Sequence, residues 1–156
     1  EGLYAPVPPD GAAFVRFIDA DPKASDLGRV PSAGGKNYDA LTDALFPAIQ
    51  EPLLTRYPNF IYAGAVDLRG YFPTHNLRFS QPLTGDRARD MIGNRTKRIF
   101  DDRVGSRCGS HEFDFLTQTY RRDTGEVMYD ISAPIYVCGR HWGGFRIGFA
   151  AHGKAG

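Results

Sequence analysis

The chain has 156 residues, of which 42% are hydrophobic and 24% charged, and this suits one globular domain rather than two. Nineteen basic and eighteen acidic residues give a net charge of +1, which excludes the large positive field typical of nucleic-acid-binding domains. Two cysteines, Cys108 and Cys138, are too few for a disulfide framework and favour free thiols in a reducing compartment. A cytoplasmic location is therefore expected, with the periplasm as the alternative.

The chain divides into three parts by composition. Residues 1–37 hold many prolines and a Gly-Gly pair, so we expect a largely irregular entry segment. Residues 38–150 carry the regular apolar patterns and are predicted to form the domain. Residues 151–156 lack packing side chains and are predicted to be a tail.

A leading helix is predicted first in the domain. Leu41, Leu45, Ile49 and Leu53 recur at every fourth residue and form one apolar stripe, and Asn37 or Asp39 could cap its start. Two prolines, at positions 47 and 52, fall inside this pattern and predict a kink or an early stop. The segment 57–59, Tyr-Pro-Asn, ends the helix.

The middle of the chain reads as a hairpin followed by a helical crossover. Two apolar runs, 60–66 and 71–76, flank a turn that ends in Gly70 and predict two paired strands. Residues 80–84 form a loop, and residues 87–100 carry helix formers interrupted by Gly93, which predicts one or two short helices.

The last third carries strand signals throughout. Residues 113–121, 127–137 and 142–150 are strand-like and are separated by Gly-containing turns. Pro134 predicts an edge position or a bulge. The whole order predicts an α+β fold of the PAS/Cache kind, with a five-stranded antiparallel sheet, a leading helix and a helical crossover that together enclose a pocket.

Four long and irregular motifs point to a family. They are GYFPTHN at 70–76, NRTKRIFDDRVG at 94–105, QTYRRD at 118–123 and GRHWGGFR at 139–146. In this order they resemble the sensor-like domain of bacterial methyl-accepting chemotaxis proteins, over about residues 38 to 150. The resemblance implies a domain at the cytoplasmic end of a receptor, joined to a helical signalling module that controls a histidine kinase. It also implies a homodimer paired through the leading helix.

Residues at the hairpin end and in the crossover are the first candidate ligand-binding residues. His75 and Asn76 end the hairpin, where a histidine either is a hydrogen-bonded structural residue or donates to a ligand or coordinates a metal. Arg98 and Arg103 come from the crossover, and arginine offers a planar fork to a carboxylate.

Strand alternation supplies the other candidates. Gln118 and Tyr120 share one strand face, and Asp130 and Ser132 share a face of the next strand. If these faces turn inward, cation, amide, phenol and carboxylate groups meet in one pocket, which suits an amino acid or a small organic acid. An ordinary polar sheet face is the competing interpretation.

A second hypothesis starts from the spacing of Cys108 and His111. A Cys-x-x-His pair on a Gly-containing loop can reach one metal ion, with His75, His141 or Cys138 as further ligands. His111 is also a candidate ligand-binding residue. The chain would then be a metal- or haem-based redox or gas sensor, whereas the first hypothesis needs no cofactor.

Motifs of hydrolases, phosphate-binding loops and zinc proteases are absent from the sequence, so we do not expect an enzyme. The leading hypothesis is a sensing domain that binds a small molecule and passes a conformational change to the signalling module of the same receptor. No nucleic-acid partner is expected.

Overall fold

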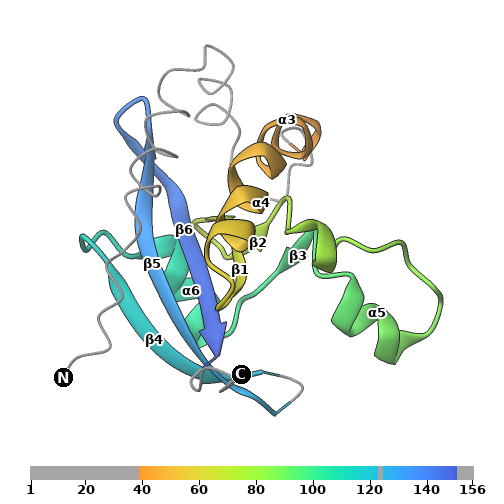
Figure 1. Cartoon of the computed structure of the whole chain (residues 1–156). Coiled ribbons are helices and arrows are strands. Elements are labelled where there is room, and N and C mark those ends of the chain that lie inside the picture. Colours follow the sequence, from red (N-terminus) through yellow and green to blue (C-terminus); the bar gives the residue numbers. More distant parts are fainter. Residues whose placement is uncertain (1–38, 123–124, 151–156) are drawn as a thin grey trace.

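The computed structural model of the protein describes residues 39–122 and 125–150 (Figure 1). The predicted entry segment and tail lie outside these residues, as does the predicted cap Asn37. The elements follow in this order: helices α3 (Asp39–Leu45) and α4 (Pro47–Arg56), strands β1 (Phe60–Asp67) and β2 (Tyr71–Phe72), the 3-10 helix η2 (Leu77–Phe79), helix α5 (Arg87–Gly93), strand β3 (Arg98–Ile99), helix α6 (Arg103–Ser110), and strands β4 (Leu116–Arg121), β5 (Val127–Val137) and β6 (Arg140–Ala150).

The main sheet has four antiparallel strands in the order β1-β6-β5-β4, so the fold is α+β as predicted. The prediction of five strands in one sheet is wrong. The second arm of the hairpin forms only the two-residue strand β2, which pairs with β3 in a separate sheet. Pro73 has no backbone N–H to donate, so it cannot extend the pairing as an ordinary strand residue would.

The leading helix is broken where its first proline predicts. Phe46 separates α3 from α4, and Pro47 occupies the first turn of α4, where a missing N–H costs little. Pro52 is tolerated inside α4, which ends at Arg56, just before the predicted stop. Asp39 lies in the first turn of α3 and accepts hydrogen bonds from the Tyr71 hydroxyl at 2.9 and 3.0 Å.

The crossover is more varied than the prediction of one or two short helices within 87–100. α5 ends at Gly93, and Arg98 and Ile99 form a strand rather than a helix. A further helix, α6, begins after Asp102, whose carboxylate accepts the backbone N–H of Gly105 at 2.7 Å. Cys108 therefore lies in a helix, not on the predicted loop, and His111 caps its end.

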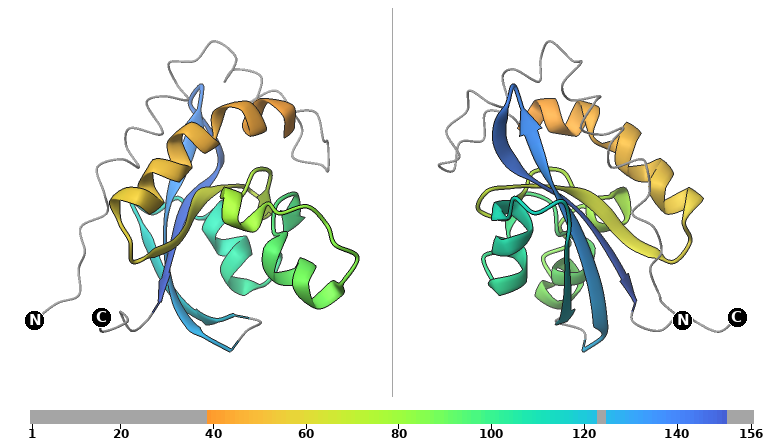
Figure 2. Two further views of the ribbon diagram at one scale, coloured as in Figure 1. Left: turned by 45° about the vertical axis from the view of Figure 1, so that its right-hand side comes forward. Right: turned by 90° about the vertical axis from the view of Figure 1, so that its left-hand side faces the viewer.

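Helices cover the two faces of the sheet differently (Figure 2). α3 and α4 lie on one face, over a core that includes Ala63, Phe145 and Trp142, whose ring meets Phe46 edge-on at 6.3 Å. α6 lies on the opposite face, where Tyr62, Met128 and other large side chains alternate with the first set. α5 projects away from the rest of the fold (Figure 1) and buries no residue.

Glycines allow α6 to approach the sheet at backbone distance. A Cβ atom on Gly144 in β6 would lie 2.0 Å from the carbonyl oxygen of Cys108. A Cβ atom on Gly109 in α6 would lie 2.0 Å from the carbonyl oxygen of Asp67 in β1. Neither position has room for a side chain, so both glycines set how closely helix and sheet pack.

Pro134 lies where β5 has a partner on one side. The pairing of β4 with β5 starts where Arg121 faces Val127 and stops where Leu116 faces Ser132. Beyond that point, among the described strands, β5 pairs with β6 alone, and Pro134 faces Gly144. The register between β5 and β6 shifts immediately afterwards, between Ile135 and Tyr136. The predicted edge position is therefore confirmed, and the irregularity in pairing falls just after the proline rather than at it. Among the described helices, none is long and apolar enough to cross a membrane.

Candidate functional site

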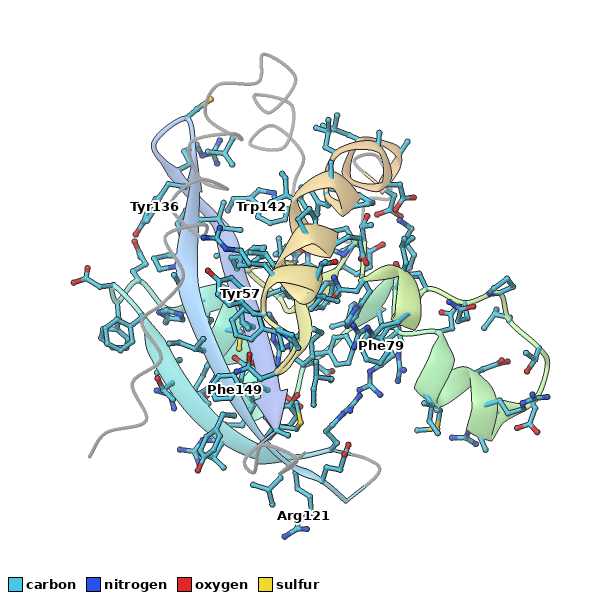
Figure 3. All side chains as sticks on the ribbon, in the orientation of Figure 1. Tyr57, Phe79, Arg121, Tyr136, Trp142 and Phe149 are labelled. Carbon is cyan, nitrogen blue, oxygen red and sulfur yellow. The ribbon has the colours of Figure 1, made fainter. Side chains whose placement is uncertain are left out.

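A cavity of about 130 Å³ lies between the sheet, the β2–β3 pair and the start of α6. β1, β4 and β6 contribute Tyr62, Tyr120 and Arg146 from the sheet face opposite α4. The remaining described lining residues are Phe72, His75, Phe79, Arg95, Arg98, Phe100, Asp102, Val104, Arg121 and Arg122. In Figure 3 Arg121 marks the far end of β4, and Tyr136 and Trp142 mark the opposite end of the sheet.

His75 lies in this cavity as a neutral ring. It is 4% exposed and stacks on Phe72 with the ring centroids 4.1 Å apart. The backbone N–H of Asn76 donates to Nδ1 at 2.8 Å, which places the remaining ring proton on Nε2. Burial, followed by the positive charges of Arg95, Arg146, Arg122 and Arg98, lowers the pKa of His75 well below 6.5. His75 therefore offers one N–H donor at neutral pH.

A buried ion pair closes the sheet side of the cavity. Arg146 donates from Nε and Nη2 to Oδ2 of Asp130 at 2.9 and 2.7 Å. The Tyr62 hydroxyl donates to the same oxygen, and the Cys108 thiol donates to Oδ1 at 2.9 Å. Burial lowers the pKa of Arg146, but the Asp130 carboxylate more than offsets it, and the pKa is raised well above its ordinary value.

The groups around this ion pair are protonated at neutral pH. Burial raises the pKa of Cys108 to about 12 and raises those of Tyr62 and Tyr120 above their ordinary value. The two phenols also meet each other at 3.1 Å. These groups therefore act as hydrogen-bond donors, not as nucleophiles or bases.

Arginines lie over the aromatic side chains of the cavity. The guanidinium carbons of Arg95 and Arg98 are 5.5 and 5.6 Å from the ring centroid of Phe100, and that of Arg122 is 5.7 Å from the centroid of Phe79. Such cation–π contacts hold the guanidinium groups against the aromatic wall of the cavity. The cavity is thus both aromatic and cationic.

The segment that carries His75 is bonded to the leading helices on both sides. Thr74 donates from its hydroxyl to Asp43 in α3 at 2.6 Å, and its carbonyl accepts from Gln50 in α4 at 3.0 Å. Asn76 donates to Glu51 in α4 at 3.1 Å and accepts the N–H of Ala63 in β1 at 2.9 Å. A movement of His75 would therefore change the hydrogen bonds that its neighbours Thr74 and Asn76 make with α3 and α4.

Four of the eight predicted ligand-binding residues meet at this site. His75, Arg98 and Tyr120 line the cavity, and Asp130 lies directly behind Arg146. Asn76 is fully buried beside it, with its amide bonded within the protein as described above. Sequence alternation correctly placed Asp130 and Ser132 on one buried face.

The other three predicted residues lie elsewhere. Arg103 is exposed at the start of α6 and does not line the cavity. Gln118 faces α6, where it donates to the carbonyl of Val104 at 3.1 Å. His111 contacts the Ser132 hydroxyl at 3.0 Å from the far end of α6.

The metal-ligand candidates named from the sequence are not brought together. Cys108 bonds to Asp130, His111 contacts Ser132, His141 meets the carbonyl of Gly143 at 2.9 Å, and His75 lies in the cavity. Across residues 39–122 and 125–150, no three His, Cys, Asp or Glu side chains are placed to hold one metal ion. Both cysteines are free thiols, Cys108 buried and Cys138 exposed.

Two central residues of the site were missed from sequence. Arg146 is the one charged residue between Trp142 and Ala150, an otherwise apolar strand, and a charge there must be paired when the strand is buried. That signal could have found it. Tyr62 carried no such signal, because a tyrosine in an apolar strand is ordinary.

In comparisons with known proteins, no family model and no curated protein sequence matches this chain.

Proposed function

We propose that this chain is the ligand-sensing domain of a bacterial chemotaxis receptor, which binds a small molecule of the amino-acid or organic-acid class in the cavity at His75. The observation that carries the proposal is the cationic and aromatic cavity. Its lining comes from all four quoted motifs: Phe72 and His75, Arg98 and Phe100, Tyr120 and Arg122, and Arg146. Aromatic walls with a few directed polar groups are typical of small-molecule sites.

The fold supports the PAS/Cache part of the proposal. A leading helix pair, a strand turn, a helical crossover and a three-stranded meander follow one another, and β1 lies beside the last strand, β6. β2 follows β1 through a tight turn and contacts it, although it pairs with β3. The cavity lies where the crossover meets the sheet, as expected for this kind of sensor.

The hydrogen bonds of Thr74 and Asn76 suggest the route of the signal. Both residues flank His75, and both are bonded to the leading helices, Thr74 to α3 and α4 and Asn76 to α4. A ligand that shifts His75 would bias the position of these helices, and the helices would pass the change to the signalling module.

Binding measurements test the proposal. Isothermal titration of the purified chain against amino acids, organic acids and purines should find at least one binder. The affinity for that ligand should fall in Arg98→Gln, which alters the cavity, and should be unchanged in Arg103→Gln, which alters an exposed arginine. Absence of binding across the panel by a folded protein would contradict the proposal.

The same preparation separates the metal- or haem-sensor hypothesis. A Soret absorption band, or a stoichiometric metal that is lost in Cys108→Ser or His111→Asn, would replace the small-molecule proposal. A colourless, metal-free protein that binds a panel compound would support it.

A further inference from the structure

The charge of the cavity lining is strongly unbalanced. Five arginines line it, at positions 95, 98, 121, 122 and 146, against the single described carboxylate of Asp102. That carboxylate already accepts the Gly105 N–H at the start of α6. The lining therefore favours a negatively charged occupant.

The nearby carboxylates do not cancel this charge. Asp130 accepts hydrogen bonds from Arg146, Tyr62 and Cys108, and Glu126 pairs with Arg122 at 3.2 Å. Among the described residues, these two and Asp102 are three carboxylates beside the five arginines of the lining. Among the described residues, Asp102 is the carboxylate that lines the cavity, and it accepts the Gly105 N–H through Oδ1.

Two donors on the buried side of the cavity have no acceptor among the described residues. They are Nη1 of Arg146, whose Nε and Nη2 are used by Asp130 and Tyr62, and Nε2 of His75, whose Nδ1 is used by Asn76. Both side chains line the cavity and are about nine-tenths buried or more, at 5% and 4% exposure. A carboxylate has two acceptor oxygens and suits such a pair.

The volume and the aromatic wall limit the rest of the ligand. An apolar cavity of about 150 Å³ holds benzene, so about 130 Å³ admits about six non-hydrogen atoms. Phe72, Phe79 and Phe100 supply apolar surface that a purely inorganic anion would leave unused.

We infer that the cavity selects a short organic carboxylate of about six non-hydrogen atoms that carries no ammonium group. This inference rests on the proposed function, because it assumes that the cavity is the ligand site. The carboxylate accepts from Arg146 and His75, the short carbon chain contacts the phenylalanines, and Arg98 adds a further cation. An amino acid of the same size is disfavoured because its ammonium group would face five arginines and, among the described lining residues, a single carboxylate.

Lactate and alanine provide a matched test, because they differ in a hydroxyl and an ammonium group and are almost equal in size. Isothermal titration of the purified chain should show binding of L-lactate or pyruvate, and L-alanine should bind at least about ten-fold more weakly. Arg98→Gln should weaken lactate or pyruvate binding about ten-fold or more, because a positive charge of the cavity lining is lost, whereas Arg103→Gln should leave binding unchanged. Inorganic phosphate serves as the anion without a carbon chain.

The outcomes separate this inference from the proposed function. Alanine binding as tightly as lactate and pyruvate, or phosphate binding as tightly, would overturn the inference and leave a ligand-binding cavity. Binding of a larger amino acid or a purine, with no short carboxylate bound, would do the same. Absence of any bound compound in the whole panel would overturn both.

Discussion

Removing the buried carboxylate at position 130 should be among the most damaging single changes in the protein. Asp130→Asn leaves the Arg146 guanidinium, which is 6% exposed as a side chain, without its counter-charge. Breaking a buried ion pair from one side costs about 3–5 kcal/mol, because the remaining charge is neither solvated nor paired. We expect the free energy of unfolding to fall by about this amount, a large share of the 5–15 kcal/mol typical of a domain.

Equilibrium urea denaturation measures this loss, followed by far-UV circular dichroism and by the fluorescence of the single tryptophan, Trp142, which is 8% exposed. Asp114→Asn, at an exposed carboxylate, is the control and should change stability by less than about 0.5 kcal/mol. A second variant, Asp130→Leu with Arg146→Met, removes both charges and should recover much of the loss. A loss below about 1 kcal/mol in Asp130→Asn, or a double variant no more stable than the single one, would refute the reasoning.

Three further predictions concern pH, thiol reactivity and packing. The pKa of His75 is lowered in the folded state, so below about pH 6.5 the unfolded chain binds one more proton than the folded chain and the free energy of unfolding falls. Between pH 7.5 and 5.5, the free energy of unfolding in urea should fall by about 1.4 kcal/mol more in the wild type than in His75→Gln, and an equal fall in both would contradict this prediction. Burial raises the pKa of Cys108 to about 12, so a thiol reagent at pH 8 should label only the exposed Cys138 of the two cysteines in the native protein and both cysteines in urea. Rapid labelling of both thiols in the native protein would contradict this prediction. Gly144→Ala forces a methyl group against the Cys108 carbonyl and should lower the free energy of unfolding in urea by at least about 2 kcal/mol. Gly93→Ala in α5, whose new methyl group would make only ordinary contacts, should leave stability unchanged or raise it, and equal effects of the two changes would contradict the packing argument.

The outline of the fold could be predicted because local chemistry sets it. The proline at position 47 marked the break in the leading helix, and the Gly-containing turns marked the ends of β5 and β6. β2 was overestimated because its apolar residues resemble a longer strand. The partner that it finds, β3, comes from a segment whose own pattern is helical, and local periodicity does not report such tertiary pairings.

The candidate site could be predicted in part, and for a similar reason. Alternation grouped Tyr120 with Gln118 and Asp130 with Ser132, each pair on one strand face, but it left open whether these faces turn inward, as they do in the structure. It could not say which of the arginines turns inward, since Arg98 lines the cavity and Arg103, five residues later, faces solvent. That difference depends on where α6 begins, which Asp102 determines by capping the helix.

The close seating of α6 on the sheet gives the two sides of the cavity different kinds of support. Because Gly144 and Gly109 bring backbone against backbone, α6 cannot approach β1 and β6 more closely. The other side is the segment from β2 to β3, which carries Arg98 and is joined to α3 by Lys97, whose ammonium group donates to Asp43 at 2.7 Å. A displacement of this segment would therefore stretch or break its bond to α3 without disturbing the packing of α6 on the sheet.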